Sequence, residues 1–453
     1  MATPQSADPS VTNNEAISDT NQSDISIQTI HTTSGCDICV PGSVTDLVSY
    51  VLMEQEHWFE PELEFLLGAA KHFKRAIDIS ALYGIYSLPL SHELDKIFVF
   101  ESSPVTTWYL KQSIEKNNTD NITIISRDNG DAENNFGNFN LDDSSKLFSL
   151  DNIDLVIINL GGNEINILDN AQEFLANNEP LIVYRRNKEP QACKQIVNIL
   201  KDSGYQCFYL VPGVQLLSPV AEIETIESST TNLFFCKEST SVNLNKLGFL
   251  CNTLKEVNHN DHDSTQILDF FDNFPYSQSL KESWRENLNP SDTTTAYQRS
   301  LLYYFKSHDQ SIAANKRVAY LMESFNSLSE AIETSAGLPQ LLTLARISYE
   351  LGLTSTALQS LSAILETFCS DQIMTVNEPF LATHPEFDQV DPGEQFGEWI
   401  FSSALQSYLW QKSFSSYFMG KQEQATLQGL ATDPFVQART ERARQLLNIK
   451  LGD

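Results

Sequence analysis

The stretch Ala76-Ile-Asp-Ile-Ser-Ala-Leu-Tyr-Gly-Ile-Tyr-Ser-Leu88 is followed a few residues later by Ile97-Phe-Val-Phe-Glu101. Together they read as a strand, a Gly-containing turn, a helix, a second strand and an acidic residue. The turn needs small residues so that backbone can approach a ligand, and a carboxylate after the second strand can accept hydrogen bonds from both ribose hydroxyls. The pattern is typical of α/β folds that bind an adenosyl nucleoside, with Gly84 and Glu101 in these two roles.

On both sides of this stretch, from about Val40 to Glu238, apolar runs rich in Ile, Val and Phe alternate with amphipathic stretches. The runs predict strands at residues 75–80, 97–101, 122–126, 155–160, 181–184, 207–211 and 232–236. Helices are predicted at residues 105–117 and 189–203, with Gly204 closing the second. Strands buried on both faces and joined by helices predict a doubly wound, largely parallel α/β sheet. The polar segment 129–143 is predicted to be a loop.

Six segments occur in an order that resembles a known family. The matching segments are Tyr50-Val-Leu-Met-Glu-Gln-Glu-His-Trp-Phe-Glu60, Asp78-Ile-Ser-Ala-Leu-Tyr-Gly-Ile-Tyr86, Val99-Phe-Glu-Ser-Ser-Pro104, Leu155-Val-Ile-Ile-Asn-Leu-Gly-Gly-Asn-Glu164, Leu210-Val-Pro-Gly213 and Asn232-Leu-Phe-Phe-Cys-Lys237. They resemble the lead-in helix, the D-x-G-A-N-x-G-x-Y loop, the A-F-E-P-x-P and K-I-D-x-E-G-x-E motifs and the closing segments of the FkbM family of S-adenosylmethionine-dependent methyltransferases. The closing segments resemble those of its long-chain branch.

The resemblance implies a Rossmann-like sheet, S-adenosylmethionine as cofactor, and methyl transfer to a hydroxyl of a sugar or related metabolite. The cofactor-binding residues that it implies are Asp78, Ser80, Ala81, Gly84, Glu101 and Asp128. The catalytic residues that it implies are Glu164 and Asn159.

Several motif positions depart from the family's pattern. Ser80 replaces the first loop Gly and Leu82 the loop Asn, while Asn159 replaces an Asp and Arg185 stands where an acidic residue is usual. An amide has no useful basicity near neutral pH, so Glu164 is the best remaining acid–base candidate. Two functions therefore remain open: an active methyltransferase, or a catalytically degenerate methyltransferase fold that acts as a binding or scaffold module.

The domain organisation follows from changes in composition. Residues 1–39 are predicted to be a disordered acidic tail, residues 40–240 the methyltransferase domain, residues 241–310 a connector with short helices, and residues 311–453 an all-α domain. Ala345, Gly352 and Ala357 have the spacing of a tetratricopeptide helix pair, although a plain helical bundle fits equally well. Residues 379–393 are predicted to form an extended loop held by its aromatic side chains.

Charge and cysteine content limit the partners. The net charge of -30 argues against nucleic acid or an anionic membrane as a partner. We therefore expect a small-molecule or glycan acceptor, with a protein partner possible through the helical C-terminal region. Scattered cysteines, no signal peptide and no apolar run long enough for a bilayer predict a cytoplasmic protein. Cys36-Asp-Ile-Cys39 has no second pair at zinc-site spacing. The two histidines among the carboxylates of residues 258–263 could hold a metal, but surface connectors often carry such residues without a ligand, so no metal is expected.

Overall fold

The computed structural model describes residues 26–126, 140–160, 162, 164–187, 189–252, 257, 265–288, 295–369 and 375–452. Asp128, the metal candidate at 258–263 and most of the predicted tail and loop lie outside these residues. The described chain divides into two compact units. We call residues 26–210 and 217–249 the sheet unit, and residues 211–216 and 250–451 the helical unit.

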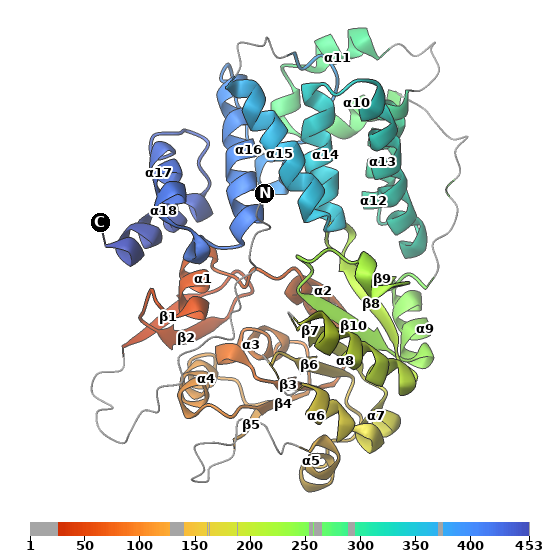
Figure 1. Cartoon of the computed structure of the whole chain (residues 1–453), viewed down its shortest axis with the longest axis vertical. Coiled ribbons are helices and arrows are strands. Elements are labelled where there is room, and N and C mark those ends of the chain that lie inside the picture. Colours follow the sequence, from red (N-terminus) through yellow and green to blue (C-terminus); the bar gives the residue numbers. More distant parts are fainter. Residues whose placement is uncertain are drawn as a thin grey trace. The chain divides into compact units, whose positions relative to one another are not determined.

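The sheet unit contains an eight-stranded sheet in the order β5-β4-β3-β6-β7-β10-β8-β9 (Figure 1). Its strands are β3 (Arg75–Ile79), β4 (Lys96–Phe100), β5 (Ile122–Ile125), β6 (Leu155–Ile158), β7 (Leu181–Arg185), β8 (Gln206–Val211), β9 (Leu216–Pro219) and β10 (Asn232–Cys236). Strands β3 to β7 are parallel, and β10 is antiparallel to β7 and β8. The chain leaves β3 toward β4 and later returns to add β6 on the other side, which confirms the predicted doubly wound sheet.

Helices precede the sheet and connect its strands. They are α1 (Leu47–Gln55), α2 (Glu62–Ala70), α3 (Ser87–Leu90), α4 (Pro104–Lys116), α5 (Leu141–Phe148), α6 (Glu164–Asp169), α7 (Gln172–Asn178), α8 (Pro190–Asp202) and α9 (Glu238–Leu247). Gly204 follows α8 with a φ of 86°, as its predicted role in ending that helix requires.

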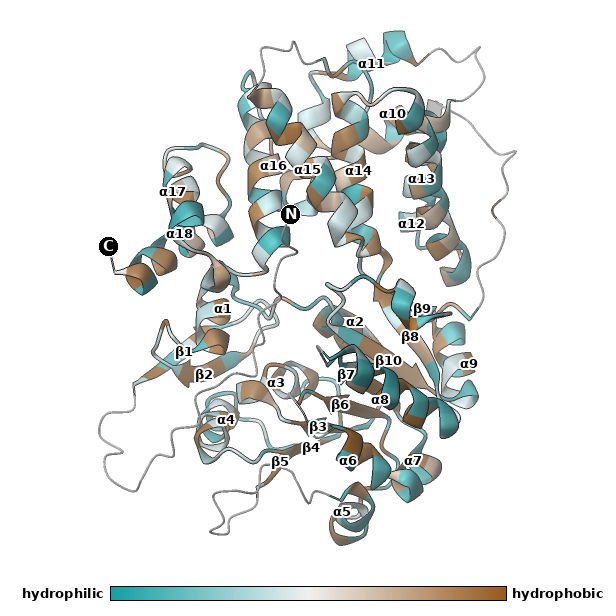
Figure 2. Ribbon diagram, viewed as in Figure 1, coloured by the Kyte–Doolittle hydropathy of each residue, from teal (hydrophilic) through white to brown (hydrophobic). Residues whose placement is uncertain are grey.

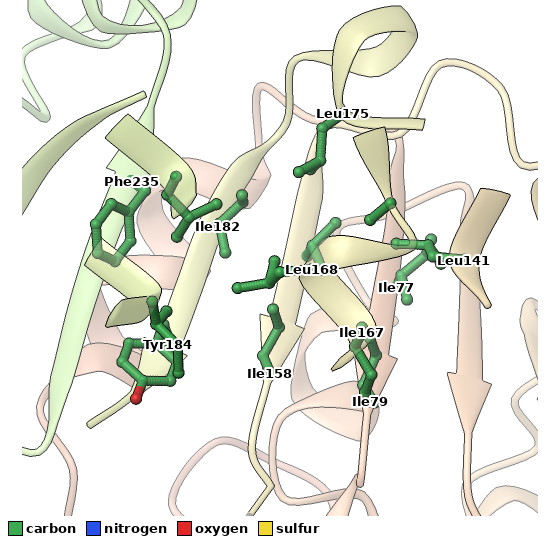
Figure 3. Close-up of a cluster of buried hydrophobic side chains, with 14 of the residues drawn as sticks. Ile77, Ile79, Leu141, Ile158, Ile167, Leu168, Leu175, Ile182, Tyr184 and Phe235 are labelled. Atoms are coloured by element: carbon green, nitrogen blue, oxygen red, sulfur yellow. The ribbon is translucent and has the colours of Figure 1, made fainter. Parts of the chain in front are cut away.

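Two faces of the sheet are buried in different ways. On one face, alternate strand residues pack against α5 to α8 in a large apolar cluster. Figure 3 shows part of it, with strand residues Ile77, Ile79, Ile158, Ile182, Tyr184 and Phe235 beside Leu141, Ile167, Leu168 and Leu175. On the opposite face, Phe65 of α2 meets Phe234 of β10 edge to face at 5.2 Å. The strands are accordingly mostly in the hydrophobic colour in Figure 2.

The sheet unit starts earlier than expected. Residues 27–39, assigned to the disordered tail, include β1 (Ile27–His31) and most of β2 (Asp37–Pro41), which pair antiparallel. Ile30, Ile38 and Val40 are buried, and the Asn117 side chain accepts from the backbone N–H of Asp37 and donates to its carbonyl. This burial and pairing give a short polar stretch a fixed structure that local composition does not reveal.

The helical unit also starts earlier than expected. It contains α10 (Thr265–Phe271), α11 (Lys281–Asn287), α12 (Ala296–His308), α13 (Ala314–Thr334), α14 (Leu338–Leu351), α15 (Thr354–Phe368), α16 (Phe396–Ser413), α17 (Lys421–Gly429) and α18 (Ala438–Leu451). Helix α12, in the expected connector, packs along α13, so the unit begins near residue 250 rather than 311. The predicted helix pair is α14 and α15, with Gly352 between them at a φ of 76°. Its tetratricopeptide character stays a prediction.

A network of buried charges lies inside the helical unit. The Arg346 guanidinium donates to Glu350 at 2.6 Å and to Asp388 at 2.7 and 3.0 Å. Tyr304 donates to Oε1 of Glu350 at 2.7 Å, and Nε2 of His308 lies 3.0 Å from Oε2. Although burial opposes ionisation, the charges of Arg346 and His308 lower the pKa of Glu350 to about 2.

Residues 211–216 belong to this helical unit although they lie between β8 and β9 in the sequence. A Cβ atom added to Gly213 would lie 2.3 Å from Cβ of Glu350. The carbonyl of Val214 accepts a hydrogen bond from Arg317 at 3.3 Å, and Pro212 contacts the position of Gly352. The Pro-Gly pair that resembles a family motif is therefore packed against α14, where only a glycine fits.

Candidate functional site

The polar side chains of the sheet gather at the carboxyl ends of its parallel strands. Asp78 is in register with Val99 of β4 and Ile157 of β6, so Asp78, Glu101 and Asn159 alternate to one face. Arg185 ends β7 on that face, and Asn232 pairs with it from β10. This face is opposite the apolar cluster of Figure 3. In open α/β sheets, ligands bind outside the carboxyl ends of the strands where the order reverses, here between β3 and β6.

The loop after β3 has an unusual backbone. Ser80, Leu82, Tyr83 and Gly84 have φ values of 68°, 44°, 67° and 92°. A non-Gly residue in this left-handed region costs roughly 1–2 kcal/mol, and Gly or Asn tolerates it best. The Gly and Asn of the resembling family pattern thus correspond to two positions where this chain has Ser80 and Leu82. Strained backbone of this kind is concentrated at functional sites in proteins.

Gly84 has a second reason to lack a side chain. A Cβ atom there would lie 2.7 Å from Cδ1 of Leu110 and 2.9 Å from Cδ1 of Leu88. A side chain at position 84 would therefore point into the protein interior. Both the positive φ and the close packing require glycine at this position. Leu82 is half-buried.

The two acidic residues predicted to bind the cofactor lie close together. Ser87 donates a hydrogen bond to Oδ2 of Asp78, while Oδ1 has no partner among the described residues. The N–H of Ser103 donates to Oε1 of Glu101 at 2.9 Å, and backbone hydrogen bonds from Ser102 and Ala81 also stabilise its charge. Burial nevertheless raises the pKa of both carboxyl groups to about 7. Glu101 thus connects the loops after β3 and β4.

Arg185, the basic residue at a position where an acidic one was expected, has its positive charge paired with Glu60. Its Nη1 atom donates to Oε1 of Glu60 at 2.7 Å and to Oδ1 of Asn159 at 3.3 Å. The Tyr86 hydroxyl also donates to Glu60. The segment before α2 therefore neutralises the positive charge of Arg185.

Glu62 joins the same group from the first turn of α2. Burial raises the pKa of its carboxyl group to about 8, and the Glu60 carboxylate adds to this, while hydrogen bonding to Asn232 and the charge of Arg185 oppose it. Our sequence reasoning missed Glu60, Glu62, Tyr86 and Asn232 as site residues. The signal available for the first two was the run of acidic residues that begins α2.

The two residues predicted to be catalytic have different partners. Asn159 accepts from Arg185, whereas Oε1 of Glu164, at the start of α6, accepts from the N–H of Gly162 at 3.0 Å. The charge of Glu164 acts on Tyr184, which belongs to the apolar cluster on the other face. Asn159 therefore lies within the group around Arg185, while Glu164 lies toward the opposite face.

Within the described ranges, no group of three or more His, Cys, Asp and Glu side chains is placed to hold a metal ion. A search of the same residues for a helix long and apolar enough to cross a bilayer found none.

Comparison with known proteins gave matches at the level of structure alone. No family model and no curated protein matches the sequence. Precorrin-6y C5,15-methyltransferase from Geobacter metallireducens is 18% identical over 39% of this chain and 89% of that chain, with a TM-score of 0.26. M. jannaschii TYW2, solved with AdoMet, is 17% identical over 47% and 86% of the two chains, with a TM-score of 0.29. An rRNA methylase from Streptococcus thermophilus is 16% identical over 38% and 91%, with a TM-score of 0.27. At these values we base no conclusion on the likeness.

Proposed function

We propose that the sheet unit is an S-adenosylmethionine-dependent methyltransferase that methylates a hydroxyl group of a sugar or related metabolite. The observation that carries this proposal is the place of Glu101. It follows β4, accepts hydrogen bonds from the backbone of the loops after both β3 and β4, and lies one strand away from the strand-order reversal between β3 and β6. A carboxylate there is suited to the two hydroxyls of a ribose.

The described residues around Glu101 fit such a cofactor. Oδ1 of Asp78 and Nδ2 of Asn159 are buried polar atoms without a protein partner among the described residues, as expected beside a polar ligand. The backbone of Ser80 to Gly84 would line the methionine end. The cofactor supplies an electrophilic methyl carbon, so the protein mainly has to position an acceptor in line and manage its proton.

The proposal is tested by calorimetric titration of the full chain with S-adenosylmethionine and with S-adenosylhomocysteine. We expect Glu101→Gln to weaken binding by about 10- to 100-fold, because hydrogen bonds to a charged acceptor contribute about 1.5–3 kcal/mol. The matched control is Glu115→Gln, an exposed residue of α4, which should bind like the wild type. Equal affinity of the wild type and Glu101→Gln would remove Glu101 from the site.

The second candidate is a degenerate fold that binds a partner without catalysis. The observation that favours it is Asn159, an amide held by Arg185 where the family has a carboxylate. This candidate predicts no binding of either nucleoside at millimolar concentration. Micromolar binding of S-adenosylmethionine would favour the enzyme.

A further inference from the structure

Buried polar atoms without hydrogen-bond partners occur at the ligand edge of the sheet unit and in the segment that leads into α2. Among the described residues they include Nε1 of Trp58, Oε2 of Glu62, Oδ1 of Asp78 and Nδ2 of Asn159. Glu62 and Asn159 are deeply buried, with only 4% and 7% of their surface exposed. Most buried polar groups in proteins are hydrogen-bonded, and unpaired ones usually mark a ligand, ion or water. The set includes both hydrogen-bond donors and acceptors. A ligand hydroxyl group, which both donates and accepts hydrogen bonds, needs partners of both kinds.

Glu62 and Asn159 are connected through Arg185. The Arg185 guanidinium donates to Asn159 and to Glu60, and its charge also acts on Glu62. Hydrogen bonding to Asn232 favours the ionised form of Glu62, but Oε2 of Glu62 has no hydrogen-bond partner among the described residues and is left for a ligand. The start of α2 thus supplies a carboxyl group, that of Glu62, near the end of β6. At that strand end Asn159 stands where the family that the chain resembles has an acidic residue.

The charge of this group limits the ligand. The four carboxyl groups of Glu60, Glu62, Asp78 and Glu101 outnumber the one guanidinium that is paired within this group of described residues, that of Arg185. Phosphorylated or carboxylated ligands would add negative charge to a buried acidic site and be repelled. A neutral polyhydroxyl compound meets no such penalty.

We propose that Glu62 is the acid–base residue of the acceptor site, that the Asn159 amide orients the acceptor hydroxyl, and that the acceptor is uncharged. This inference rests on the proposed methyltransferase function. It moves the acid–base role from Glu164, which lies toward the other face of the sheet, to a residue of the segment before the sheet.

The step balances with a sulfonium methyl donor. The acceptor's hydroxyl oxygen forms a bond to the methyl carbon, the carbon–sulfur bond breaks, and its electron pair stays on sulfur, which becomes a neutral thioether. The hydroxyl proton passes to Oε2 of Glu62. Nδ2 of Asn159 donates a hydrogen bond to the hydroxyl oxygen of the acceptor. This hydrogen bond orients the acceptor so that the attacking lone pair of that oxygen is directed toward the methyl group.

The pH dependence follows from the environment of Glu62. The groups that act on it are Glu60, which disfavours its ionisation, and Arg185 and Asn232, which favour it. Since the pKa of Glu62 is raised to about 8, only its ionised form above that pH can take the proton. The rate of transfer should therefore rise with pH and level off above about 8.

The experiment uses the full chain, S-adenosylmethionine and methyl α-D-glucopyranoside as the neutral probe, with glucose 6-phosphate as the anionic one. S-adenosylhomocysteine formation is followed from pH 6.5 to 9.5, and cofactor binding is measured separately by calorimetry. We expect Glu62→Gln to lose at least 100-fold in rate and its pH dependence, while cofactor affinity stays within twofold. Glu64→Gln, an exposed acid in the same helical turn, is the matched control and should keep both.

The outcomes separate the two proposals. If the wild type binds no cofactor, the proposed function fails, and this inference fails with it. If cofactor binds but Glu62→Gln keeps its rate, or Glu164→Gln alone loses the pH dependence, Glu62 has been misassigned. Transfer to glucose 6-phosphate in preference to the neutral probe, or no transfer to the neutral probe, contradicts the charge argument.

Discussion

Two buried glutamates, one in each unit, have opposite environments. Glu350 of the helical unit is surrounded by Arg346, His308 and Tyr304, and its pKa is lowered to about 2. Glu62 of the sheet unit is equally buried, has another carboxylate beside it, and its pKa is raised to about 8. A buried charge costs free energy unless it is paired. The buried acid of the helical unit is paired with cations, whereas Oε2 of the buried acid in the sheet unit has no hydrogen-bond partner among the described residues.

The two environments distinguish a structural network from a candidate ligand site. A network whose donors and acceptors are matched contributes to a unique structure, and its perturbed pKa values need no ligand. A group of buried residues with unpaired polar atoms and raised pKa values is a stronger candidate for a ligand site. Such a group lowers the stability of the fold, and no structural role explains that loss.

The largest expected effect is on the paired network. Arg346→Ala would leave Asp388 buried without its cation and Glu350 with His308 as its remaining cationic partner, and should destabilise the helical unit by about 3–5 kcal/mol. The control is Arg299→Ala, whose partner Glu330 is exposed, and which should cost less than about 1 kcal/mol. Urea denaturation of both variants measures this. A small loss for Arg346→Ala would mean that the network is not structural.

The second prediction is a gain in folding stability, whereas the first is a loss. Because the folded-state pKa of Glu62 is raised from 4.5 to about 8, the folded protein holds this proton more tightly than the unfolded chain. Its favourable contribution is complete below about pH 4.5 and is lost as pH rises to 8. Glu62→Gln should therefore gain stability over the wild type between pH 5 and 9, by on the order of 3 kcal/mol at the upper end.

Thermal melting across this pH range tests the second prediction, with Glu64→Gln as the exposed control. A stability difference between Glu62→Gln and the wild type that does not change with pH would show that Glu62 ionises normally, and would erase the contrast with Glu350.

A third prediction concerns the close packing around Glu350. Gly213→Ala places a methyl group against Cβ of Glu350, and we expect a loss of about 1–3 kcal/mol from overpacking. Gly397→Ala, in helix α16 with open space around its added Cβ atom, should be neutral or slightly stabilising. If both substitutions have the same effect on the urea midpoint, the glycine at 213 is not needed for packing.

The smallest effect is expected in the loop after β3. Ser80→Gly should stabilise the sheet unit by about 0.5–1 kcal/mol, because glycine relieves the strain of the φ of 68° at Ser80, and the greater entropy of the unfolded glycine chain offsets only part of that gain. Ser102→Gly, at a residue without a positive φ, should lose a few tenths instead. Melting temperatures that fall for both would indicate an unstrained loop.

Much of the fold could be predicted from local sequence. The runs of β-branched residues predicted β3 to β8 and β10 to within a residue or two, because a strand buried on both faces needs continuous apolar sequence. β1, β2 and β9 were not predicted, since they are short, polar or end in proline. Their stability comes from contacts with distant residues such as Asn117.

The candidate site was predictable only where it follows the strands. Asp78, Glu101 and Asn159 end parallel strands, so their positions follow from the strand pattern. Glu60 and Arg185 are far apart in sequence and meet only in the folded unit. Asn232 reaches the same edge because β10 runs antiparallel, a direction that no local pattern indicates.

Residues 211–216 have a consequence for synthesis of the chain. This hexapeptide is made with the strands on either side of it, but its partners Arg317 and Glu350 emerge from the ribosome more than a hundred residues later. At typical translation speeds the delay is on the order of ten seconds. During that interval the newly made strands carry a segment that has nothing to pack against. A chain interrupted after residue 250 would keep that segment exposed, so splitting the gene there should give two fragments that depend on each other.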